Sequence, residues 1–469
     1  MFLFLVRDYI LLFLIKIVKF FIEFGFIFIV FLFFEKCLSK NLSLQNIKYI
    51  FKLNFIEESL HISYNNNKGV DKVKAVGLIV EYNPFHNGHK YHLEKAKQES
   101  KADIAIAVMS SNFIQRGEPA LLDKWARTEM AIQNGVDIVI ELPVFYSNQS
   151  AEIFSLGAVG ILNKLKVDSI VFGSESGEVE SLKKVARLQI EKKDELDEII
   201  QKSMSDGESY PNAMAKAIKK VLNIDNIFTP NNILGIEYIK AILKLKSKIK
   251  PLTIKREKSD YHSQNIEEEI ASATSIRNAI IKGDFESIKK AVPIETYEIL
   301  EREYQKDNFV FWDDFYEILK YKIITEYDKL KNIQDMEIGF ENRIYKAILE
   351  TTNFNDFFDQ IMTKRYTISR VKRILSHILL DIDAVITKEV KQDIAPYVRL
   401  LGFNKKGMEY LKQIKKGDEV EFLTNLKGVE KKLSSKKLRM LKFEEKASNI
   451  YKIKGKNKDR KIPIIKKGK

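Results

Sequence analysis

Short apolar runs recur along residues 74–255, and longer stretches with helical periodicity separate them. Most of these runs are rich in Val and Ile, which is typical of strands buried on both faces of a parallel sheet. Their alternation with helices predicts a doubly wound, Rossmann-like α/β domain, which binds ligands beyond the carboxyl ends of its strands. The predicted strands are Lys74–Val80, Asp103–Met109, Asp137–Leu142, Ser169–Gly173 and Leu252–Lys255, and the predicted helices are Lys90–Glu99, Asp123–Asn134, Asn148–Lys164, Glu178–Ser203 and Asn212–Val221.

From about Gly283 the pattern changes to long amphipathic stretches in which lysine, glutamate and aromatic residues interleave. Strand-like runs fade there, so we predict a mainly helical second domain. The chain thus divides into three predicted parts, which are an extension over 1–72, an α/β domain over 73–282 and a basic helical domain over 283–469. Residues 430–469 hold sixteen Lys and Arg against four acids, a balance that favours contact with RNA phosphates.

The first 72 residues differ in composition from the rest, being apolar up to Phe34 and then rich in Asn and Lys. Their longest uncharged run is the eleven residues Phe24–Phe34, whereas a membrane span needs about 20. We favour the hypothesis that this extension is a gene-start artefact and that Val73 is the true initiator. The alternative is a membrane anchor in residues 1–34, and otherwise no membrane attachment is expected.

Composition narrows the partners and the compartment. The net charge of +14 suits a polyanion such as RNA, although a lysine-rich proteome accounts for it equally well. Cys37 is the single cysteine, which excludes an intramolecular disulfide and any zinc site built from several cysteines. We therefore expect a cytoplasmic protein.

Three of the six histidines, His86, His89 and His92, follow the first predicted strand and a Tyr-Asn-Pro turn, where a helix begins. Backbone N–H groups at a helix start face an anion, and imidazoles beside them can stabilise a leaving pyrophosphate. We assign His86 and His89 to phosphates, against the alternative of helix-start histidines without a role. Asn87 stands where a zincin motif needs glutamate, so no metal site is predicted.

A second candidate clamp is the run from Ser272 to Arg277 at a predicted helix start, where Ser272, Thr274 and Arg277 could bind phosphate. An ordinary cap beside a surface arginine is the alternative. The run Gly173–Gly177 follows a strand, where glycine would let the backbone approach a nucleotide, and a plain strand-to-helix turn is the alternative. Gln115–Glu118 and Lys124–Arg127 are expected to be solvated surface, with positive groups near the ligand edge as the alternative.

A basic stretch with an embedded tyrosine runs from 364 to 373. It could contact a nucleic-acid backbone and stack one base, or it forms a solvated helix face. The residues that we assign to this nucleic-acid contact are Lys364, Arg365, Arg370, Lys372 and Arg373.

Several motifs together resemble the tRNA(Met) cytidine acetate ligase family, whose nucleotidyltransferase superfamily shares the His-x-Gly-His element. They are Val-Glu-Tyr-Asn-Pro-Phe-His-Asn-Gly-His (80–89), Gln-Arg-Gly-Glu-Pro-Ala (115–120), Lys-Trp-Ala-Arg-Thr-Glu-Met-Ala (124–131), Asn-Asn-Ile-Leu-Gly-Ile-Glu-Tyr (231–238) and Thr-Lys-Arg-Tyr-Thr (363–367). The resemblance runs from about Val73 to the C-terminal region. Residues 1–72 depart from the family pattern, which begins almost at the first strand.

The resemblance implies an enzyme that uses ATP to activate acetate as acetyl-adenylate. The acetyl group then passes to the exocyclic amine of the wobble cytidine of elongator tRNA(Met), giving 4-acetylcytidine. Domain 73–282 would be catalytic, domain 283–469 would bind tRNA, and Mg²⁺ is expected with ATP. The implied ATP site comprises Ile79, Val80, Glu81, Tyr82, Asn83, Pro84, Phe85, His86, Asn87, Gly88, His89, Lys90, Tyr91, His92, Gly173, Asn231 or Asn232, and Arg256.

Two other functions stay open at this point. The first is an adenylyl- or cytidylyltransferase for a small phosphorylated substrate, against which the basic helical domain argues. The second is a non-catalytic RNA-binding protein, against which the intact His86, His89 and Arg277 argue.

Overall fold

The structure is a computed structural model that describes residues 73–208, 210–224, 227–256, 271–415, 421–455 and 462–466. Residues 72–469 form one compact unit. Residues 1–72, and with them both hypotheses about the extension, lie outside the described residues. None of the helices that the structure describes has the length and apolarity that a membrane crossing requires.

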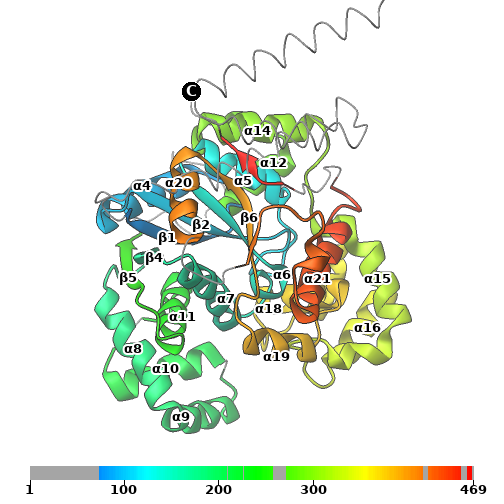
Figure 1. The fold of residues 1–469 in the computed structure, drawn as a ribbon. Helices are drawn as coiled ribbons and strands as arrows, with labels where there is room; N and C mark the ends of the chain where they lie inside the picture. The colour runs from blue at the N-terminus through cyan, green and yellow to red at the C-terminus, as the bar shows by residue number, and fades with distance from the viewer. Residues whose placement is uncertain are drawn as a thin grey trace, which may run out of the picture. The chain divides into compact units, whose positions relative to one another are not determined.

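One mixed sheet of eight strands organises this unit, in the order β5-β4-β1-β2-β3-β6-β7, with β8 paired to β6 (Figure 1). The first five strands are parallel, and their order reverses between β1 and β4. The predicted doubly wound sheet is confirmed, and its switch point lies at the carboxyl ends of β1 and β4. The strands are β1 (Ala75–Val80), β2 (Ile104–Ser110), β3 (Ile138–Leu142), β4 (Ser169–Ser174), β5 (Lys250–Lys255), β6 (Val398–Phe403), β7 (Phe422–Leu423) and β8 (Ile464–Ile465).

Helices cover both faces of the sheet, as continuous apolar strands require. Alternate residues of β1 enter different hydrophobic clusters, with Ala75 on one face and Val76 on the other. The Val76 face packs against helices α4, α5 and α12 to α14, and the opposite face packs against α7, α8 and α11. These helices are α4 (Asn87–Ser100), α5 (Lys124–Gln133), α6 (Val144–Ser147), α7 (Ala151–Lys164), α8 (Val179–Glu191), α9 (Lys193–Ser205), α10 (Tyr210–Leu222), α11 (Pro230–Lys244), α12 (Ala273–Lys282), α13 (Phe285–Ala291) and α14 (Ile294–Gln305).

The rest of the chain is mainly helical, as predicted, and packs beside the α7 face of the sheet (Figure 1). Trp312 of η1 stacks on Phe354 of α17, with ring centroids 5.0 Å apart. The elements are η1 (Trp312–Phe315), α15 (Tyr316–Thr325), η2 (Tyr327–Asn332), α16 (Phe340–Glu350), α17 (Phe354–Ile361), α18 (Ile368–Leu380), α19 (Ala384–Gln392), α20 (Lys405–Lys415), η3 (Val429–Lys431) and α21 (Ser435–Tyr451).

The sequence analysis expected strands to fade after Gly283, and strand β6 shows that this expectation was wrong. It pairs antiparallel with β3 and is buried along its whole length. A second correction concerns Glu178–Ser203, predicted as one helix but split at Lys192 into α8 and α9. The break lets α8 pack on α11 while α9 packs on α10, which one straight helix would not allow.

Buried charges tie the C-terminal helix α21 to the sheet. Lys124 forms ion pairs with Glu141 of β3 and with Glu444 of α21, the latter at 3.1 Å from Nζ to Oε1. Arg399 of β6 reaches the second oxygen of Glu141 at 3.3 Å and lies over the ring of Trp125. These four charged groups are almost wholly buried, so each depends on its partners for compensation.

Candidate active site

A tight turn joins the end of β1 to the start of α4 at the carboxyl edge of the sheet. Tyr82 has a φ of +50°, and the Asn83–Pro84 peptide bond is cis. The rings of Tyr82 and Phe85 are buried, with centroids 4.7 Å apart, and His86 is the N-cap of α4. The predicted order of strand, turn and helix start is confirmed, and such a helix N-terminus favours an anion.

The segment 111–123 holds this turn in place. The backbone N–H of Gln115 donates to Glu81 Oε1 at 2.9 Å, and that of Leu121 donates to Asn83 Oδ1 at 2.7 Å. Arg127 Nη1 donates to the Glu81 carbonyl at 2.7 Å. Lys124 and Arg127 are fully buried, so the expected solvated surface is wrong at these two positions, because their cations bind acids and carbonyls inside the protein.

The rings of His86 and His89 lie side by side, with centroids 3.7 Å apart. The backbone N–H of His86 donates to His89 Nδ1 at 3.3 Å. Because a neutral imidazole carries one proton, this hydrogen bond places the His89 proton on Nε2, where it can be donated to a ligand. Along the described chain, His86 Nδ1 and His92 Nε2 are buried nitrogens without a hydrogen-bond partner, so they are available to a ligand as well.

Burial keeps these imidazoles neutral at physiological pH. Burial first, and then the nearby Arg256 and Arg277, lower the pKa of His86 to about 3. Burial and Arg256 lower the pKa of His92 to about 4, and burial with the neighbouring histidines holds the pKa of His89 well below its usual value. The site therefore presents neutral imidazoles, with the His89 Nε2–H as a donor, beside two guanidinium groups, an arrangement suited to phosphate oxygens.

The second predicted clamp is brought to the same turn. Ser272 caps α12 by accepting a hydrogen bond from the Ser275 N–H at 3.0 Å. Arg277 Nη1 donates to the Asn83 carbonyl at 3.0 Å, and its Nη2 lies 3.3 Å from Thr274 Oγ1. Ser272 is thus the ordinary cap of the alternative, but the Arg277 guanidinium is hydrogen-bonded to the turn that carries the histidines and is only 18% exposed.

The loop after β4 borders the turn on the other side of the switch point. Glu175 accepts hydrogen bonds from Asn231 Nδ2 at 2.7 Å and from the Asn232 N–H at 3.0 Å, while Asn232 Oδ1 accepts one from the Glu175 N–H at 3.0 Å. Both asparagines thus hold this loop. A Cβ on Gly173 would lie 3.1 Å from Arg256 Cγ, so glycine permits the close approach of Arg256.

The remaining predicted ligands lie along β1 and α4. Ile79 and Val80 end the strand, and Gly88 belongs to the first turn of the helix. Asn87 Nδ2 donates to the Lys290 carbonyl at 2.9 Å, which ties α4 to the end of α13. Lys90 is exposed and Tyr91 is half-buried.

Comparison with known proteins bears on this arrangement. The family described as HIGH Nucleotidyl Transferase matches residues 73–462. The tRNA(Met) cytidine acetate ligase of Fusobacterium nucleatum is 43% identical over 402 residues, which cover 84% of this chain and 99% of that protein. The chain belongs to the tRNA(Met) cytidine acetate ligase family.

Further relatives agree with this membership. The tRNA(Met) cytidine acetate ligase of Caldicellulosiruptor saccharolyticus is 44% identical over 384 residues, covering 81% of this chain and 94% of that protein. Crystal structures of Thermotoga maritima TmcAL, one without ligand and one bound with alpha-thio ATP, are 33% identical and superpose with TM-scores of 0.80 and 0.77. Each covers 84% of this chain and is itself covered completely.

In this member of the ligase family, the predicted tRNA-binding residues lie on and before α18, and acids hold four of them. Glu337 binds Arg365 at 2.8 Å and Arg370 at 2.7 Å, and it accepts a hydrogen bond from the Tyr366 hydroxyl. Lys372 binds Glu118, and Arg373 lies 4.0 Å from Asp335 and donates to the Gln115 carbonyl at 3.4 Å. Lys364 and Arg365 are exposed, whereas Lys372 and Arg373 face the 115–118 loop.

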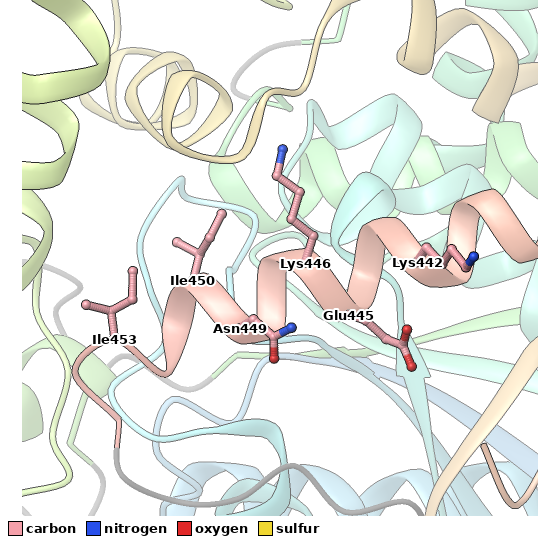
Figure 2. Close-up of a pocket in the computed structure, with 6 residues that line it drawn as sticks. All are labelled: Lys442, Glu445, Lys446, Asn449, Ile450 and Ile453. Carbon is pink, nitrogen blue, oxygen red and sulfur yellow. The ribbon is translucent and has the colours of Figure 1, made fainter. Parts of the chain in front are cut away.

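An open hollow of about 590 Å³ lies along one face of α21 (Figure 2). Lys442, Lys446 and Asn449 on this face are exposed. No residue of the turn after β1 lines the hollow, and its lining mixes basic, acidic and apolar side chains. We do not assign the nucleotide to it, because the histidines and guanidinium groups converge at the switch point instead.

Proposed function

We propose that this chain is an ATP-dependent ligase that activates acetate and acetylates the wobble cytidine of elongator tRNA(Met), forming 4-acetylcytidine. The observation that carries the proposal is the meeting of His86, His89 and Arg277 at one turn, in a chain of this ligase family. In the first step, an acetate oxygen attacks the α-phosphorus of ATP. The bond to the β-phosphate breaks, and acetyl-adenylate and pyrophosphate form.

His86 and His89 would donate N–H hydrogen bonds to the phosphates as charge develops on the leaving pyrophosphate. In the second step, the exocyclic amine of the cytidine attacks the acetyl carbonyl carbon, AMP leaves, and the amine loses a proton. We assign ATP to residues 79–92, Gly173, Asn231 or Asn232, and Arg256, with Ser272, Thr274 and Arg277 at the phosphate end. The binding of alpha-thio ATP by T. maritima TmcAL supports an ATP site here.

Within the part of the chain that the structure describes, no cluster of three or more His, Cys, Asp or Glu side chains is placed to hold a metal ion. We propose Mg²⁺ as the counter-ion of ATP, held by its phosphates, and we name no protein ligand for it.

The tRNA would lie against the basic helical part of the chain. Exposed Lys364 and Arg365 beside Tyr366 offer two cations and one aromatic ring, a combination that suits an RNA backbone and an unstacked base. Arg370, Lys372 and Arg373 complete the proposed set, although acids and carbonyls hold them. We propose the cytoplasm, where tRNA is found, as the compartment of the protein.

The decisive experiment incubates the protein with ATP, labelled acetate and purified elongator tRNA(Met). We expect label in the tRNA, dependent on ATP, and 4-acetylcytidine on nuclease digestion. A tRNA with uridine at the wobble position is the matched control and should stay unlabelled. Absence of transfer under saturating conditions would reject the ligase assignment. Transfer of a nucleotidyl group to a phosphorylated small molecule, or RNA binding without turnover, would instead support one of the two alternatives.

A further inference from the structure

The loop Gln115–Glu118 lies between the turn that carries the histidines and helix α18. Gln115 donates its N–H to Glu81 on the turn side, and its carbonyl accepts a hydrogen bond from Arg373 of α18. A Cβ on Gly117, which has a φ of +78°, would lie 2.2 Å from the backbone nitrogen of Arg373. The loop is therefore seated directly on the α18 backbone, and only glycine fits there.

Glu118 at the end of this loop is shared between two cations. Its Oε1 lies 2.6 Å from Lys372 Nζ, and its Oε2 lies 3.6 Å from Arg277 Nη2. The three side chains are about equally enclosed, with exposed fractions of 21% for Glu118 and Lys372 and 18% for Arg277. The carboxylate is thus held closely by Lys372 and more loosely by Arg277.

Glu118 is ionised at neutral pH. Burial acts to raise its pKa, but Lys372 and Arg277 together lower that pKa below its usual value. A carboxylate so near Arg277 opposes the binding of anionic phosphates, and it also competes with them for the guanidinium. Lys372 offsets both effects because it neutralises the carboxylate and binds it more closely than Arg277 does.

We propose that Lys372 is a positioning residue for ATP, which binds the Glu118 carboxylate closely and so keeps its ion pair with Arg277 long and weak, which leaves the guanidinium available to the phosphates. The inference rests on the proposed function only in placing ATP phosphates at Arg277. It assigns Lys372 a task at the nucleotide site, in addition to any contact with RNA.

The test is calorimetric binding of ATP to the full chain, without acetate or tRNA. Lys372→Gln should weaken ATP binding roughly fivefold to tenfold, because Glu118 then turns to Arg277. Glu118→Gln should bind ATP at least as tightly as the wild type. The double variant Lys372→Gln with Glu118→Gln should return to within about twofold of the wild type.

Two further variants control for charge and for folding. Lys388→Gln removes an exposed positive charge from α19 and should leave ATP binding unchanged. Lys372→Arg keeps the cation and should bind ATP nearly as well as the wild type. The proposal is overturned if Lys372→Gln binds ATP normally, if Glu118→Gln alone weakens binding, or if the double variant is no better than Lys372→Gln. Since no acetate or tRNA is present, failure of the acetylation assay would leave this test intact.

Discussion

At the scale of single residues, His89 carries the sharpest prediction. Its Nδ1 accepts the His86 N–H, so its Nε2 proton is free for donation to the leaving pyrophosphate. His89→Ala should slow acetyl-adenylate formation by about 10²–10³, the usual effect of losing one such donor. Acetate-dependent exchange of labelled pyrophosphate into ATP measures this step. Binding of tRNA by the same variant should stay normal, and exchange at the wild-type rate would remove His89 from the mechanism.

The lowered histidine pKa values also predict how stability depends on pH. His92 has a pKa of about 4 in the folded protein and about 6.5 when unfolded, so the unfolded chain binds more protons between these values. The contribution of His92 to the free energy of unfolding should therefore be fully present above about pH 6.5 and be lost as the pH drops toward 4. Replacing His92 by Asn should reduce the loss between pH 7 and pH 5 by about 1–2 kcal/mol. Urea unfolding at the two pH values measures this difference, and an unchanged pH dependence would contradict it.

At the scale of elements, the sequence was sufficient for most of the sheet but not for the loops around it. The strands β1 to β4 were predicted because each contains a compact apolar run, and Ser272 could be recognised as a helix cap. Strand β6 was missed because Val-Arg-Leu-Leu-Gly-Phe stands alone among helices and carries a buried arginine. Its buried arginine pairs with Glu141 of β3, some 260 residues earlier, and the local sequence pattern around β6 cannot predict a pairing over that distance.

The candidate site divides in the same way. The histidines and the Ser272–Arg277 run could be recognised as candidate phosphate ligands from the sequence, because their residue types stand beside a predicted strand or helix start. Arg127 in helix α5 and Glu118 in its loop gave no comparable signal, because a charged residue is expected at the surface until its partners are known. Four carbonyl oxygens, those of Glu81, Ser110, Ser111 and Leu122, accept hydrogen bonds from Arg127, and only the fold brings them together.

The close contact between the 115–118 loop and helix α18 predicts how a substitution at Gly117 affects stability. Gly117→Ala should destabilise the protein by about 2–4 kcal/mol, since a Cβ there meets backbone and the positive φ disfavours alanine. Gly283 has a similar φ of +72° but nothing within 4 Å of its Cβ position, so Gly283→Ala should cost only about 1 kcal/mol. Chemical denaturation compares the two variants. Equal losses would mean that the loop does not press on α18.

At the scale of the whole molecule, a domain boundary was predicted between residues 282 and 283, but the segments before and after it contribute strands to one sheet. Strand β6 pairs with β3 and so extends the sheet beyond the parallel strands, and Glu444 of α21 binds Lys124 inside the protein. Glu444 also accepts the Val144 N–H at 2.6 Å. Neither side can release these contacts without leaving Lys124 and Glu141 short of partners, so the two sides should not unfold independently.

The two tryptophans of the chain test this directly, because one lies on each side of the boundary. Trp125 lies beside Arg399 near the buried charges, and Trp312 stacks on Phe354 in the helical part. In the single-tryptophan proteins Trp125→Phe and Trp312→Phe, the remaining fluorophore reports one side at a time. After each midpoint is corrected for the stability change of its own substitution, measured by circular dichroism, we expect the fluorescence and dichroism transitions to coincide in urea, as one cooperative unit requires. A Trp312 transition that precedes loss of the overall dichroism would mean that the helical part unfolds first, as a domain of its own.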